Sequence, residues 1–232
     1  MAYEGYKIAK QLSMAEQQKS DDVQIYVRQL YLVVMAIKEV VETIELYRKI
    51  SVTPLTNIDL LQDLECNNSP ESTTWKEDIK SLFSMLIHFY NSDLQTFEYL
   101  LDLIITNHKL ILLLDNLDYW TSNDTTEHFK RFATADIMYK YGTVLQNYTK
   151  NDELVNDAIL TLIRHVFGDC ELNSVILQPI ILETLLKITE NDYNPCKKWR
   201  DLIERVLNLS KFRAICSAYA ESRITRKIQK KI

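Results

Sequence analysis

Residues 23–50 read VQIYVRQLYLVVMAIKEVVETIELYRKI, and this run sets the fold class. Its apolar side chains recur at steps of three and four residues, the period of an amphipathic α-helix. Many of them are β-branched, as in a strand, but an unbroken pattern of about 28 residues is too long for an ordinary strand. Ser20, Asp21 and Asp22 precede the run and supply an N-cap with acidic residues near the first turn. The run therefore predicts one long helix, whose apolar positions are Val23, Tyr26, Val27, Leu30, Tyr31, Val34, Ile37, Val41, Ile44 and Tyr47.

The segments around this run also predict helices, joined by connections of a few residues. A helix with a weaker apolar stripe is expected from Ala2 to about Lys19, and a short one over residues 55–64, after Pro54. The polar run 67–72 is loop-like, and the next helix is expected to start near Thr74. Residues 91–93 end that helix and cap another over residues 94–105.

The second half of the chain continues in the same way. We expect a short break at residues 106–108, after which the apolar run from residue 110 leads to Asp118. Later helix starts are expected at residues 123–124, 134, 151–152, 172–173 and 193–195. Strand signals are absent from the pattern, so the sequence predicts an all-α protein.

Two architectures fit a succession of helices, a compact bundle and an α-solenoid of stacked helices. Residues 100–105, 110–114 and 176–186 are apolar on two faces, as expected for helices flanked on both sides by others. A strict repeat of about 40 residues cannot be written down. We therefore favour an irregular armadillo/HEAT-like α-solenoid, with residues 1–232 forming a single helical domain.

Composition excludes several classes of protein. The 232 residues carry 27 Lys and Arg against 32 Asp and Glu, a net charge of −5, so no direct nucleic-acid partner is expected. Only 3 glycines occur, too few for a glycine-rich phosphate loop or a barrel with many tight turns. Every apolar run is far shorter than the roughly 20 residues that cross a bilayer, and no secretory signal is visible. Cys66, Cys170, Cys196 and Cys216 lie far apart and predict buried thiols of a reduced compartment.

The residues that could carry chemistry form no known catalytic or metal-binding pattern. His88, His108, His128 and His165 never pair at three or four residues and have no nearby cysteine. Carboxylate pairs such as Asp115 and Asp118 are expected to cap helices or to be solvated. Motifs of serine hydrolases, zinc proteases and P-loop proteins are absent. We therefore expect no enzymatic activity, no cofactor and no metal.

The basic run at residues 223–231 contains five cations in nine residues. One interpretation is a nuclear-import or nucleic-acid patch, and the other is a solvated last helical turn, where cations are favoured by the helix dipole.

From residue 129 onward the sequence resembles the Timeless family. The resemblance rests on residues 130–137 (KRFATADI), 141–148 (YGTVLQNY), 151–159 (NDELVNDAI), 163–165 (IRH), 177–182 (LQPIIL) and 196–206 (CKKWRDLIERV). More loosely, residues 26–32 and 101–108 are similar to preceding helices of the same region. Residues 178–182 and 199–204 are more similar to the insect circadian branch than to the replication-fork paralogue. Residues after Leu209 carry no part of the resemblance, and Lys197 and Lys198 stand where the clock proteins look acidic.

The resemblance implies a non-enzymatic scaffold that corresponds to the central armadillo-like region of a longer protein. In the clock branch, it implies binding to a Period-like and a Cryptochrome-like protein, negative regulation of clock transcription, and shuttling between nucleus and cytoplasm. In the fork branch, it implies a Tipin-like partner and replication-fork protection. A generic helical adaptor remains the alternative outside the family.

The candidate partner-binding residues gather at the expected start of the last helix. They are Tyr193, Lys197, Lys198, Trp199 and Arg200, with His165 added from an earlier helix. Cations at a helix N-terminus are locally unfavourable, which suggests a use such as meeting acidic or phosphorylated residues of a partner. The alternative interpretation is that Trp199 fills the core and the two lysines are solvated.

Overall fold

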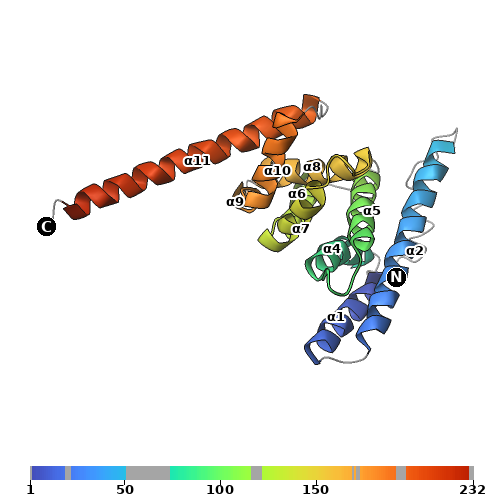
Figure 1. Ribbon diagram of the computed structural model, residues 1–232. Coiled ribbons are helices and arrows are strands. Elements are labelled where there is room, and N and C mark those ends of the chain that lie inside the picture. Colours follow the sequence, from blue (N-terminus) through green and yellow to red (C-terminus); the bar gives the residue numbers. More distant parts are fainter. Residues whose placement is uncertain are drawn as a thin grey trace.

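The computed structural model describes residues 2–18, 22–50, 74–115, 122–168, 170, 173–191 and 197–229 (Figure 1). These residues form ten helices, and the described part of the chain contains no strand. The helices are α1 (Ala2–Gln18), α2 (Val23–Ile50), α4 (Thr74–His88), α5 (Phe97–Asp115), α6 (Ser122–Phe132), α7 (Ala135–Leu145), α8 (Glu153–Gly168), α9 (Asn173–Ile176), α10 (Pro179–Glu190) and α11 (Lys197–Gln229). The all-α prediction is confirmed.

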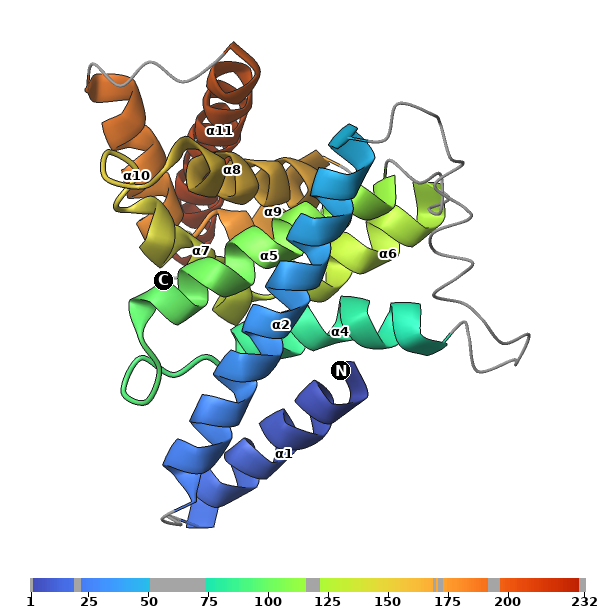
Figure 2. The same cartoon turned by 90° about the vertical axis from the view of Figure 1, so that its right-hand side faces the viewer.

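The helices stack in two parallel rows (Figures 1 and 2). In one row α1 packs on α4, α4 on α7 and α7 on α10, while in the other α2 packs on α5, α5 on α8 and α8 on α11. Each layer consists of one helix from each row, for example α1 with α2. The two remaining helices lie beside the rows, where α6 packs on α8, and α9 packs on both α7 and α8. Every inner helix is therefore flanked on both sides, which is the arrangement of an α-solenoid.

One core of buried apolar side chains runs through all the layers, from Ala9 of α1 to Leu207 of α11. The long helix α2 contributes a buried stripe at steps of four, three and four residues, formed by Leu30, Val34, Ile37 and Val41. Tyr31, placed in the apolar stripe by the sequence, is 41% exposed and lies beside Tyr99, with ring centroids 6.1 Å apart. Two ion pairs also join α2 to α5, Lys38 with Asp102 at 2.6 Å and Lys109 with Glu42 at 2.7 Å.

Local sequence signals set several helix starts. The Thr134 hydroxyl accepts a hydrogen bond from the backbone N–H of Ile137 at 3.3 Å, so Thr134 is the N-cap of α7, as predicted. Pro179 occupies the first turn of α10, where its missing N–H costs no helical hydrogen bond. Gly142 of α7 allows a close approach of α10, because an added Cβ would lie 2.9 Å from Cγ2 of Ile180.

Three predicted boundaries are wrong. The break expected at residues 106–108 does not exist, since α5 runs unbroken and buries Thr106, Asn107 and His108 between its neighbours. Residues 176–186 are not one helix, because the extended backbone of Gln178 separates α9 from α10. The helix predicted from residue 94 begins only at Phe97, after a turn in which the Gln95 N–H donates to the Asn91 carbonyl.

Some predictions concern residues outside the described part of the chain. These are the helix over residues 55–64, the helix start at residues 193–195, and the side chains of Cys66, Cys196 and Cys216. Cys170 is described, and its side chain is buried. Among the described helices, none is both long and apolar enough to cross a membrane.

Candidate interaction site at the start of α11

Three cations occupy the first turn of α11, which contains no acidic residue. Lys197, Lys198 and Arg200 are exposed, whereas Trp199 between them is only 6% exposed. Of the other candidate residues, Tyr193 lies outside the described part of the chain. We call the exposed side chains of Lys197, Lys198 and Arg200 the cationic edge. The buried side chain of Trp199 belongs to the same helical turn.

Trp199 attaches α11 to α8. Its indole Nε1–H donates a hydrogen bond of 2.9 Å to Oδ1 of Asp157, and the apolar residues that follow it in α11 are also buried. Buried tryptophans usually pair their N–H in this way, because an unpaired donor in the interior is costly. Trp199 is therefore a packing residue of the core and does not offer its ring to a partner.

Lys198 lies over the ring of Trp199. Its Nζ is 3.9 Å from the centroid of the Trp199 ring, a cation–π arrangement. The lysine is exposed, so the ammonium remains hydrated while its stem covers the tryptophan.

His108 of α5 reaches the same point from the opposite side of Asp157. It is 4% exposed, and its Nε2 is 3.6 Å from Oδ2 of Asp157, beyond hydrogen-bond distance. Within the described residues neither ring nitrogen has a hydrogen-bond partner. Burial lowers the pKa of His108 below its ordinary value, the Asp157 carboxylate opposes this, and the positive charges of Lys198 and His165 add to it. Three helices therefore meet at one carboxylate, and we call His108, Asp157 and Trp199 the α11 junction.

His165 lies two turns after Asp157 on α8 and is partly buried. Its ring stacks on Phe129 of α6, with centroids 3.8 Å apart and planes within 7° of parallel. Its Nε2 is 3.1 Å from a guanidinium nitrogen of Arg164. Of the predicted set, Lys198 and His165 therefore both influence the pKa of His108. Trp199 binds the same Asp157 that faces His108.

Polar side chains continue inward from the junction. Burial raises the pKa of Tyr141 of α7, and Asn107, next to His108, opposes part of this rise. On α8, the amide of Asn156 donates to the Tyr148 carbonyl at 2.8 Å. These contacts tie α5, α7 and α8 together beneath the start of α11.

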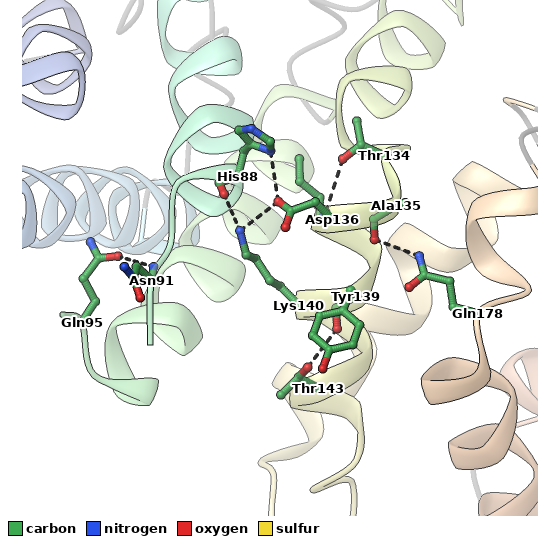
Figure 3. A network of polar contacts seen from close by, with 11 residues as sticks. His88, Asn91, Gln95, Thr134, Ala135, Asp136, Tyr139, Lys140, Thr143 and Gln178 are labelled. Carbon is green, nitrogen blue, oxygen red and sulfur yellow. Dashed lines mark hydrogen bonds and ion pairs between the residues drawn. The ribbon is translucent and has the colours of Figure 1, made fainter. Parts of the chain in front are cut away.

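A second histidine–aspartate pair lies at the surface, between α4 and α7 (Figure 3). His88 Nδ1 is 3.0 Å from Oδ2 of Asp136, and the same oxygen accepts a 2.9 Å hydrogen bond from Lys140. Lys140 also donates to the carbonyl of His88. On the other side of α7, the Gln178 amide donates to the Ala135 carbonyl at 2.8 Å. This network joins neighbouring layers at their exposed rim.

Neither pair has the composition of a metal centre. Within the described ranges, no group of three or more His, Cys, Asp or Glu side chains is placed to hold a metal ion.

The α11 junction was missed by sequence reasoning, although one signal was available. Thr106, Asn107 and His108 form a polar triplet inside a very apolar helix, and from the sequence we expected a helix break there. The alternative meaning of such a triplet is a buried polar face turned toward another helix, as His108 faces Asp157 of α8.

Comparison with known proteins places this site within a recognised sequence group. A family model described as "TOF1-like, helical domain" matches residues 135–219, which includes α7 to α10 and the first two thirds of α11. The match extends past Leu209, where the resemblance expected from sequence ended.

Two curated relatives match over most of the chain. "Protein timeless" of Drosophila melanogaster is 38% identical over 213 residues, which cover 90% of this chain and 15% of the relative. "Protein timeless" of Drosophila hydei is 38% identical over 187 residues, which cover 79% of this chain and 27% of the relative. The chain therefore spans well under a third of the length of either relative.

Proposed function

The chain belongs to the Timeless family, and on this premise we propose that it is a non-enzymatic scaffold of a clock-type regulator that binds a Period-like protein in negative regulation of clock transcription. One observation carries the proposal: the 38% identity to a protein named timeless extends over 90% of the chain. The stacked helices support it, because solenoids bind extended partner segments along their long exposed surfaces.

The cationic edge is the contact surface that we propose for this partner. Lys197, Lys198 and Arg200 are exposed in the first turn of α11, and Trp199 holds them in a fixed position against α8. Carboxylates or phosphoryl groups of a partner segment would form charge-assisted hydrogen bonds with such cations. His165, which is partly buried against Phe129, would act at the margin of this surface.

The test compares two double charge reversals on the same helix. K197E/K198E alters the cationic edge, and K211E/R213E makes the same change in charge at exposed positions farther along α11. Each variant is incubated with an immobilised Period-type protein and with a Tipin-type protein at low salt. We expect the parent and K211E/R213E to be retained by the Period-type protein and K197E/K198E to be lost.

Two outcomes would contradict this proposal in different ways. Equal retention of K197E/K198E and the parent would remove the cationic edge as the contact surface. Retention by the Tipin-type protein instead of the Period-type one would move the chain to the fork-protection branch. Both variants should unfold within about 0.5 kcal/mol of the parent, because exposed substitutions usually have effects of that size.

We further propose a Cryptochrome-like second partner and shuttling between nucleus and cytoplasm, both on family membership alone. Fluorescence microscopy of the tagged full-length protein, with and without an inhibitor of nuclear export, tests the shuttling. Nuclear accumulation under the inhibitor is expected, and an unchanged distribution would contradict it.

A further inference from the structure

The surroundings of His108 disfavour protonation of its neutral imidazole ring while α11 is docked. The His108 side chain is 4% exposed, and the Lys198 ammonium of the docked α11 adds a like charge. Docking also engages Oδ1 of Asp157 with the Trp199 indole. Each of these effects disfavours an imidazolium ion, since burial and like charges favour the neutral ring.

Undocking of α11 would remove the Lys198 charge and the indole hydrogen bond and keep the favourable effect. Lys198 and Trp199 would leave with α11. Asp157 belongs to α8, so it would remain beside His108 with both oxygens available, and Oδ2 is already within 3.6 Å. The protonated ring is thus more stable when α11 is displaced than when it is docked, and by linkage a proton favours the displaced state.

The remaining charged groups around His108 leave this balance unchanged. On α2, Lys38 and Glu42 are engaged with Asp102 and Lys109 of α5. On α4, His88 is paired with Asp136. Tyr141 of α7 is fully buried, which raises its pKa, so it stays neutral. His165 of α8 repels the imidazolium in either state, because it does not move with α11.

We propose that the α11 junction is a proton-sensitive latch, in which protonation of His108 releases the start of α11 from α8. The consequence for partner binding rests on the proposed function, because release would displace the cationic edge from its fixed position. The latch itself is a property of the isolated chain and needs no partner.

The experiment follows the Trp199 indole N–H by nuclear magnetic resonance on the 232-residue chain from pH 7.5 to 5. The resonance is assigned by its loss in W199F. In the parent, we expect it to shift with a midpoint below pH 6.5, the ordinary His value. Amide protection of residues 202–207, corrected for the intrinsic effect of pH, should fall as the pH passes from the undocked to the docked pKa of His108, by about tenfold for each pH unit that separates the two values.

The matched variants separate the latch from general acid sensitivity. H108Q should abolish both changes, whereas H88Q, which alters the exposed histidine–aspartate pair, should leave them intact. K198Q changes only an exposed side chain, and it should move the midpoint to higher pH with a smaller loss of protection. D157N keeps an acceptor for the indole but lacks the charge that favours the imidazolium, so its midpoint should move to lower pH.

The possible failures are distinguishable. A Trp199 resonance that does not move in the parent, or that moves equally in H108Q, overturns the latch. If H108Q does not fold, opposite shifts in K198Q and D157N support the latch, and identical midpoints in both overturn it. Partner retention at pH 7.5 tests the proposed function alone, since the latch is closed at that pH.

Discussion

The two histidine–aspartate pairs of this protein have the same chemistry, but their histidines have opposite surroundings. His88 and Asp136 are 3.0 Å apart, with side chains 52% and 46% exposed, whereas His108 and Asp157 are 3.6 Å apart, with side chains 4% and 39% exposed. The shorter contact is the weaker structural element, because water screens an exposed pair and hydrates either charge state. In the second pair, a change of charge on the buried histidine takes place where three helices meet.

The partners of the two carboxylates sharpen this difference. Asp136 shares one oxygen between His88 and Lys140, and Lys140 is four residues away on the same helix. Asp157 divides its two oxygens between α5 and α11, which are far apart in sequence. The exposed pair therefore adds to a contact within α7, while Asp157 adds a polar contact between helices that are far apart in sequence and already packed through apolar side chains.

The largest expected effect on the free energy of unfolding comes from replacing Trp199, the indole partner of Asp157. W199A should lower the free energy of unfolding by about 3–5 kcal/mol, because a large buried ring is removed and Asp157 loses its indole partner. Urea denaturation followed by circular dichroism measures it. A loss below about 1 kcal/mol would show that α11 is not anchored by this residue.

The next effect compares the two carboxylates directly. D157A should cost about 1–3 kcal/mol, because it leaves the buried indole N–H unpaired, whereas D136A should cost about 1 kcal/mol or less. Both variants are compared with the parent by urea denaturation at pH 7.5. Equal losses would mean that burial does not separate the two pairs.

A smaller effect concerns the pH dependence of stability. Folding lowers the pKa of His108, so the unfolded chain binds the proton more readily. The stability contributed by the neutral histidine is therefore complete above pH 6.5, and it is lost as the pH falls through the folded-state pKa. Between pH 7.5 and 5.5 the parent should lose more stability than H108Q, as measured by urea denaturation at each pH. A parallel decline in the two proteins would contradict this sign.

The smallest effect is expected for the exposed histidine. H88A should change the free energy of unfolding by no more than about 0.5 kcal/mol, since His88 is half exposed and Lys140 still pairs with Asp136. Thermal denaturation of the variant and the parent at pH 7.5 checks this. A drop comparable to that of D157A would show that the rim network holds the layers together.

Much of the architecture was predictable because its causes are local. The period of residues 23–50 and the N-cap at Thr134 act within one or two helical turns, and the structure contains the corresponding helix features. The position of Trp199 near a helix start was also readable from the sequence. Its burial was left open between two interpretations, because an aromatic residue flanked by cations fits either a surface or a core.

By itself the sequence determined the all-α class, most helix starts and the family, because these depend on side-chain period, capping residues and runs of similar residues. Only the tertiary structure decided that residues 106–108 belong inside a helix, and that His108, Asp157 and Trp199 meet. These three residues come from helices of different layers, and the direction in which each side chain points depends on how those layers stack. Helical period records which face of a helix is apolar, but it holds no information on which distant helix will cover that face.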